Sequence, residues 1–106
     1  MKTQRKDRFN EVIRDLSARF LSMESNRTSM ITITKVASTD KGDRVTIYFT
    51  VYPENQEDAA LDFAKRKRSD FRNFVRDNSR LSIIPFFEFE IDRGEKARQK
   101  IDAIAL

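Results

Sequence analysis

Residues 44–53 read RVTIYFTVYP, and their pattern predicts a β-strand. Apolar residues occupy every second position from Val45 to Val51, with threonine or tyrosine at the positions between them. This alternation is the period of a β-strand that buries one of its two faces. Because Pro53 lacks the N–H group that pairing in a sheet requires, we expect the strand to end at Tyr52.

The sequence before this strand predicts its partner in a hairpin. Residues 30–36 are rich in isoleucine and threonine, which favour strands. Residues 38–43, Ser-Thr-Asp-Lys-Gly-Asp, have the composition of a turn between the two strands. Further upstream, residues 5–23 have apolar side chains at spacings of three and four, which predicts an amphipathic helix before a polar break at residues 25–29. The apolar residues of this helix are Phe9, Val12, Ile13, Leu16, Phe20 and Met23.

The sequence after the strand predicts an interrupted helix. Asn55 is placed to cap a helix that begins at Gln56. Lys67 stands where the apolar stripe of this helix should continue, and Ser69 is placed to cap or bend a fresh turn. We expect either a kinked helix or two helices that meet near residues 67–69. The apolar stripes are Ala60, Phe63 and Ala64 before the break, and Phe71, Phe74 and Val75 after it.

A third strand is expected over residues 82–91, followed by a short helix over residues 92–106. Pro85 lies near the start of the strand and favours an edge position or a bulge. One face of the strand is apolar and the other is acidic. The apolar face holds Ile83, Phe87, Phe89 and Ile91, the acidic face holds Glu88 and Glu90, and the apolar side of the last helix holds Ala97, Ile101, Ile104 and Ala105.

The order helix, strand, strand, kinked helix, strand, helix predicts an α+β fold. The connection from the second strand to the third favours a right-handed crossover, which places the helices on one face of a three-stranded sheet. We expect the core beneath the helices to contain Phe9, Ile13, Leu16, Val45, Ile47, Phe49, Phe71, Phe74, Phe87 and Phe89.

The composition of the 106 residues excludes several classes of protein. With 39% hydrophobic and 36% charged residues, the chain is suited to one domain with a modest core. It has no cysteine and no histidine, which excludes disulfides, thiol nucleophiles, imidazole bases and metal sites built from these residues. No apolar run approaches the roughly 20 residues that cross a bilayer. We expect a soluble, cytoplasmic protein without a cofactor or a metal ion.

The net charge is +4, and the sharpest local excess of positive charge lies between Lys65 and Arg80. Four arginines repeat every four residues from residue 68 to residue 80, which predicts a slanted ridge opposite the apolar side of the helix. A basic surface of this kind favours a polyanionic partner, most often nucleic acid. The alternative is a solvated helix face with Asp70 and Asp77 as ionic partners. The candidate RNA-binding residues of this segment are Lys65, Arg66, Lys67, Arg68, Arg72, Arg76 and Arg80.

A second basic cluster lies at the N-terminus. It is either a further phosphate contact or the solvated start of a helix. Lys41 and Arg44 in the predicted hairpin are weaker candidates for the same role. The N-terminal cluster consists of Lys2, Arg5, Lys6 and Arg8.

The strand faces opposite the predicted core hold two further groups of candidate functional residues. Tyr48 and Tyr52 either stack on bases or cover the sheet. Glu88 and Glu90 share one face at roughly 7 Å by strand rise, but acid–base catalysis also needs a cleft that perturbs one pKa. We expect these carboxylates to be solvated and the protein not to be an enzyme.

Residues 81–92 read Leu-Ser-Ile-Ile-Pro-Phe-Phe-Glu-Phe-Glu-Ile-Asp, which carries the pattern Leu-x-x-apolar-Pro-x-apolar-x-Phe-x-x-Asp. Arg5, Arg8 and Phe9 match a family pattern at the first helix, Arg72 matches an arginine after the kink, and residues 100–104 match the C-terminal end. In their order and spacing these elements resemble the ribosome-binding factor A family, whose fold is a type II KH-like (K-homology) fold. The chain departs from the family at residues 67–69, where Lys-Arg-Ser replaces Ala-x-Gly.

The resemblance implies that residues 1–106 form one KH-like ribosome-binding domain. It implies a monomer that binds the free small ribosomal subunit and its 16S rRNA during late maturation, as a non-enzymatic assembly factor in rRNA processing. It implies neither a membrane nor a small-molecule substrate. The alternative is a KH-like module that binds proteins through its basic face and does not bind ribosomes.

RNA-binding KH domains clamp a nucleotide backbone with a GXXG loop. The two glycines of this chain, Gly42 and Gly94, do not form that motif. We therefore expect long arginine side chains, rather than a glycine loop, to contact phosphates.

Overall fold

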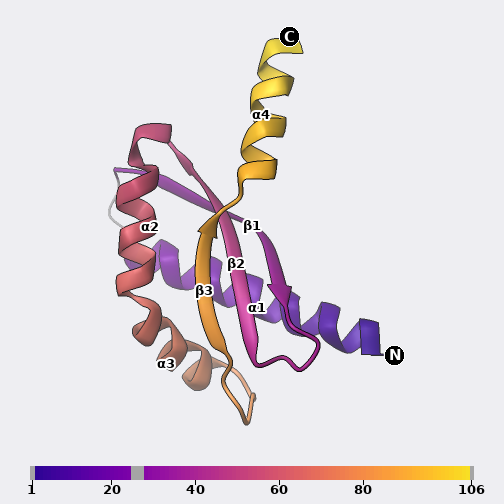
Figure 1. The fold of residues 1–106 in the computed structure, drawn as a ribbon. Coiled ribbons are helices and arrows are strands. Elements are labelled where there is room, and N and C mark those ends of the chain that lie inside the picture. Colours follow the sequence, from indigo (N-terminus) through magenta and orange to yellow (C-terminus); the bar gives the residue numbers. More distant parts are fainter. Residues whose placement is uncertain (1, 25–27, 106) are drawn as a thin grey trace.

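The computed structural model describes the backbone of residues 2–24 and 28–105, and the side chains of residues 5–23 and 28–101. The described elements confirm the predicted order of helices and strands (Figure 1). They are α1 (Lys2–Glu24), β1 (Met30–Ser38), β2 (Arg44–Tyr52), the 3₁₀ turn η1 (Glu54–Gln56), α2 (Glu57–Arg66), α3 (Arg68–Asn78), β3 (Phe86–Ile91) and α4 (Arg93–Ala105).

The three strands form a mixed sheet in the order β1-β2-β3. β1 and β2 are antiparallel, and their register is interrupted between Ile33 and Lys35. β2 and β3 are parallel, so that Ile47 pairs with Val36 on one side and with Phe89 on the other. A parallel pair requires a crossover, which α2 and α3 provide. The edge position predicted for β3 from Pro85 is confirmed.

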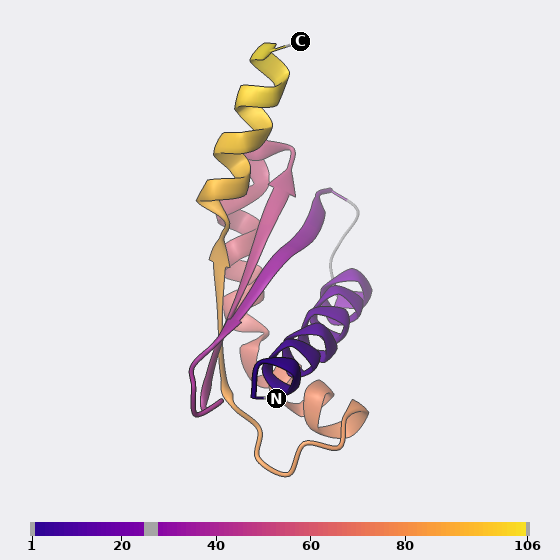
Figure 2. The same ribbon diagram turned by 90° about the vertical axis from the view of Figure 1, so that its right-hand side faces the viewer.

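Helices α1, α2 and α3 cover one face of the sheet, as predicted (Figure 2). The aromatic ring of Phe71 in α3 is central to the core between these layers. Its centroid lies 4.8 Å from that of Phe87 and 5.6 Å from that of Phe89 in β3. Phe20 of α1 reaches the same ring at 5.3 Å. Eight of the ten predicted core residues are buried, and Phe9 and Phe74 are partly buried against them.

The break between α2 and α3 is confirmed, but Ser69 does not cause it. The break lies at Lys67, whose φ of −91° and ψ of 6° depart from helical values. The N–H group of Lys67 donates to the carbonyl of Phe63 at 3.0 Å, and its own carbonyl accepts from Phe71 at 2.8 Å. No side chain caps α3, so the predicted cap at Ser69 is wrong. Lys67 Nζ instead lies 3.7 Å from a carboxylate oxygen of Asp70.

Two further boundaries differ from the prediction. β3 begins at Phe86 rather than at residue 82, and Ile83 is 83% exposed in the loop before it. Pro85 has no N–H group to pair, whereas the N–H of Phe86 directly after it donates to the carbonyl of Asp43 at 3.0 Å. Asn55 lies inside η1 and does not cap α2, which begins at Glu57 without a side-chain cap.

The apolar stripe of α1 is wider than the surface it buries. Ile13, Leu16 and Phe20 are buried, whereas Val12 is 41% and Met23 is 65% exposed. These two residues lie at the margins of the stripe, beyond the reach of the sheet.

Helix α4 extends away from the end of the sheet (Figures 1 and 2). Asp92 caps it, because its Oδ1 accepts from the N–H of Glu95 at 2.9 Å. Lys96 ties its first turns to Glu54 at 2.7 Å and to Glu57 at 3.1 Å. The predicted apolar side has no partner in its described part, since Ala97 is exposed and Ile101 is 64% exposed. The side chains of Ile104 and Ala105 lie outside the described residues. Over residues 2–24 and 28–105, no helix has the length and apolarity to cross a membrane.

Candidate nucleic-acid interface

Three of the four predicted ridge arginines belong to α3. Phe71 and Val75 turn one side of this helix into the core, Arg72 and Arg76 are exposed, and Arg68 is half-buried at the edge of the apolar side. The fourth, at residue 80, is not helical. Helix α3 ends at Asn78, where Ser79 adopts an extended conformation with φ −141° and ψ 172°. We therefore define the arginine ridge as Arg68, Arg72 and Arg76, with Arg80 in the loop that follows.

Each ridge arginine has a different contact. Arg72 Nη2 donates to the carbonyl oxygen of Ile84 at 3.2 Å. The guanidinium carbon of Arg68 lies 4.8 Å from the ring centroid of Phe86. Arg76 Nε lies 3.4 Å from a carboxylate oxygen of Asp77, and this ion pair is exposed.

These contacts decide how much positive charge the ridge retains. A carbonyl and an aromatic ring hold a guanidinium in place without neutralising it. Of the two acidic partners that a solvated face would use, Asp77 pairs with Arg76 and Asp70 pairs with Lys67. Neither carboxylate pairs with Arg68 or Arg72, so the ridge keeps most of its charge.

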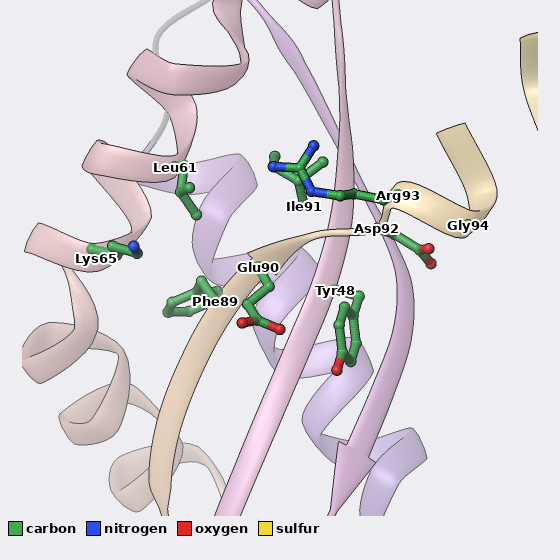
Figure 3. A pocket seen from close by; sticks show the side chains of 9 residues that line it. All are labelled: Tyr48, Leu61, Lys65, Phe89, Glu90, Ile91, Asp92, Arg93 and Gly94. Carbon is green, nitrogen blue, oxygen red and sulfur yellow. The ribbon is translucent and has the colours of Figure 1, made fainter. Parts of the chain in front are cut away.

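The basic residues that precede the ridge in the sequence differ in their contacts and exposure. Arg66 Nε turns back to the carbonyl of Asp62 at 3.4 Å, and Lys67 is paired with Asp70. Lys65 is exposed and lines an open pocket of about 420 Å³ beside the end of β3 (Figure 3). Glu90 also lines this pocket, which gives it mixed charge.

The N-terminal cluster meets the hairpin. Arg5 and Lys6 of α1 and Lys41 of the β1–β2 turn line one open groove of about 830 Å³. Lys6 Nζ lies 3.4 Å from a carboxylate oxygen of Asp40 on the same turn. Two candidate contacts that are far apart in the sequence therefore form a single basic surface. Arg8 is exposed on α1 but does not line the groove, and the side chain of Lys2 lies outside the described residues.

The uncovered face of the sheet is partly acidic. Burial and the nearby carboxylates of Glu90 and Asp92 raise the pKa of Tyr48. Arg44 forms an ion pair with Glu88 at 3.0 Å across the β2–β3 pair. The carboxylates close to Tyr48 make this part of the sheet unfavourable for a polyanion. Within the described residues, no cluster of three potential acidic, cysteine or histidine ligands is placed to hold a metal ion.

Phe86, which contacts two arginines of the candidate interface, was not among the residues predicted from the sequence. It is 43% exposed, and two guanidinium groups lie against it, that of Arg68 at 4.8 Å and that of Arg44 at 5.1 Å from the ring centroid. A signal for it existed in the strand pattern. Phe87 and Phe89 are in phase with the core, whereas Phe86 places an aromatic ring on the polar face.

Comparisons with known proteins identify solved structures of the same fold. The chain resembles the crystal structure of ribosome-binding factor A from Thermus thermophilus with a TM-score of 0.75 and 18% identity, over 83% of this chain and 96% of that one. It resembles the solution structure of a candidate ribosome-binding factor A from Thermotoga maritima with a TM-score of 0.68 and 21% identity, over 81% of this chain and 85% of that one. At these identities the likeness establishes the fold.

A search of curated protein sequences found no match. The profile of the family described as "Ribosome-binding factor A" matches residues 5–105, which is nearly the whole chain. This match spans α1, the sheet, the kink and the arginine ridge, and with it the chain belongs to the ribosome-binding factor A family.

Proposed function

We propose that this protein is a non-enzymatic assembly factor that binds the free small ribosomal subunit and its 16S rRNA during late maturation and rRNA processing. Family membership supports the ribosomal role. The observation that carries the RNA contact is the arginine ridge, in which Arg68 and Arg72 are held by a ring and a carbonyl rather than by carboxylates.

The chemistry of the ridge suits phosphate oxygens. A planar guanidinium can donate two parallel hydrogen bonds to a phosphate and keeps its charge at any cellular pH. Because Arg68, Arg72 and Arg76 follow one another along α3, their spacing lets them contact successive phosphates of a folded backbone. Contacts of this kind position a protein on RNA without reading its base sequence.

The basic groove between α1 and the hairpin supports a second contact. Arg5, Lys6 and Lys41 come from two elements, so a phosphate between them would tie both to the RNA. A compact rRNA fold presents phosphates on more than one side of a small protein, whereas a short single strand does not. The protein acts in this proposal as one soluble, cytoplasmic and monomeric domain.

Co-sedimentation with purified ribosomal particles tests the proposal. The wild-type protein should pellet with free small subunits and remain in the supernatant with intact ribosomes. Arg76→Glu should reduce pelleting, whereas Lys35→Glu makes the same change of charge on the other side of the sheet and should not. Lys35 lies over the ring of Tyr48, at 5.4 Å, remote from α3.

The outcomes separate two classes of function. Binding to small subunits that depends on Arg76 supports the assembly-factor role. Failure of the folded wild-type protein to bind either particle would overturn it, and would favour a KH-like module that binds protein partners through its basic surface.

A further inference from the structure

Three residues from three different elements meet at the start of β3. Phe86 is the first residue of this strand, Arg44 is its register partner in β2, and Arg68 begins α3. The guanidinium carbons of the two arginines lie 5.1 Å and 4.8 Å from the ring centroid of Phe86. We call this group the Phe86 site. Ile84 and Arg72 adjoin it through their hydrogen bond.

Two properties of the Phe86 site are unexpected for a surface that only needs to be soluble. The residue Phe86 is 43% exposed and nearby Ile83 is 83% exposed, so apolar surface is open to water. Two like charges also approach one ring, which costs electrostatic energy unless an anion or the ring itself compensates. Glu88 neutralises Arg44 at 3.0 Å, whereas Arg68 has no acidic partner among the described residues and lies over the ring.

The ring is held in position before any ligand binds. The N–H group of Phe86 donates to the carbonyl of Asp43 at 3.0 Å. Asp43 in turn accepts a 2.6 Å hydrogen bond from the hydroxyl of Thr39, which closes the hairpin turn. Pro85 is buried directly before the ring and restricts the backbone. A platform that is already ordered loses little entropy when a flat ligand stacks on it.

We propose that the Phe86 site binds an unpaired nucleotide of RNA, an inference that rests on the proposed function and names a feature of its substrate. The base stacks on the surface that Phe86 forms with the guanidinium groups over its ring, and Arg72 contacts an adjoining phosphate. Aromatic rings and guanidinium planes are the groups on which unpaired bases stack. Paired bases keep both faces stacked within the duplex, so only an unpaired base can offer its face to Phe86.

The Phe86 site would make the protein prefer unpaired RNA to paired RNA, which the arginine ridge alone does not do. Phosphate contacts act on paired and unpaired RNA alike. Stacking on Phe86 adds affinity only where the RNA has a bulge, a loop or a free end. The protein would then distinguish rRNA that has not completed its pairing from the same segment in its mature duplex.

The test uses a short single-stranded RNA that carries the fluorescent base 2-aminopurine, and a duplex with the same strand fully paired. Binding of the wild-type protein should quench the fluorescence of the single strand. Phe86→Leu keeps an apolar side chain but removes the ring, and it should abolish the quenching. It should also weaken single-strand binding by roughly 5- to 100-fold and leave duplex binding unchanged. Phe86→Trp should retain both quenching and affinity.

The outcomes also separate this inference from the proposed function. If folded Phe86→Leu quenches and binds as the wild type does, the Phe86 site is refuted while binding to small subunits stands. An equal loss of affinity for the single strand and for the duplex would likewise refute the Phe86 site, because phosphate contacts affect both RNAs equally. If the wild-type protein binds neither RNA nor small subunits, the proposed function fails as well.

Discussion

Arg72 donates a 3.2 Å hydrogen bond from its guanidinium to the carbonyl oxygen of Ile84, and thereby ties α3 to the loop that leads into β3. Arg76, one turn further along α3, forms an exposed ion pair with Asp77 and no other polar contact within the described part of the chain. Two arginines of the same ridge therefore differ in what they do for the fold. Arg72 stabilises the fold and also presents a positive charge to a ligand, whereas Arg76 contributes a positive charge and little to the fold.

This difference predicts different stabilities for two alanine variants. Arg72→Ala should lower the free energy of unfolding by about 0.5–1 kcal/mol, because it removes a hydrogen bond between two elements. Arg76→Ala should change it by less than about 0.5 kcal/mol, as is usual for an exposed ion pair. Urea denaturation of both variants measures the difference. Equal stabilities would show that the Arg72–Ile84 bond does not hold the loop.

The core predicts a large effect at Phe89. This residue is 2% exposed, and its ring lies 5.6 Å from that of Phe71 and 6.5 Å from that of Phe49. Phe89→Ala should lower the free energy of unfolding by about 3–5 kcal/mol through lost burial and a cavity. Tyr52→Ala, at a residue of β2 that is 76% exposed, is the control and should have little effect. Unchanged thermal unfolding of Phe89→Ala would contradict the assigned strand phase.

Acid should weaken the junction between the sheet and α4. The N–H group of Glu95 and the hydroxyl of Thr34 bond to the carboxylate of Asp92, and they hold its pKa below the ordinary value of 3.8. A lowered pKa in the folded state gives stability that is complete above the unfolded pKa, and that is lost as the pH falls through the folded pKa. Asp92→Asn should therefore be less stable than wild type at pH 7, and the difference should shrink below about pH 4. Denaturation midpoints across this range measure it, and a difference that is independent of pH would contradict the role of the carboxylate.

The basic groove predicts that the hairpin takes part in binding. Lys41 lines the groove with Arg5, although the two are 36 positions apart in the sequence. Lys41→Glu should weaken binding to small subunits and reduce its dependence on salt by about one phosphate contact. Lys35→Glu on the uncovered face serves as the matched control. An affinity equal to that of wild type would remove the groove from the interface.

The sequence pattern of apolar residues correctly predicts those helices and strands that bury one face along their length. Alternation from Val45 to Val51 fixes β2 because a pleated strand has a period of two, and the interruption at Lys67 marks the break because a charged side chain does not fit an apolar stripe. The same alternation assigns Ile83 to β3. That assignment is wrong because Pro85 lies between Ile83 and the first residue of the strand.

Contacts between distant elements could not be predicted in the same way. The ridge is expected from the spacing of its arginines, but spacing does not reveal that Arg68 meets Phe86 or that Arg72 meets Ile84. Both contacts depend on how α3 crosses β3. The meeting of Lys41 with Arg5 likewise depends on the angle between α1 and the hairpin. An apolar stripe also does not indicate whether a partner covers it, as exposed Ile101 in α4 illustrates.

A salt titration of binding to free small subunits tests whether the arginine ridge contacts rRNA phosphates. If the ridge and the basic groove together neutralise about four phosphates, the logarithm of the affinity of the wild-type protein should fall with the logarithm of the salt concentration at a slope of roughly −3 to −4. Arg76→Glu, folded by circular dichroism, should bind more weakly and flatten the slope by about one unit, while Lys35→Glu should follow the wild type. A folded Arg76→Glu protein with the affinity and slope of wild type would contradict the claim.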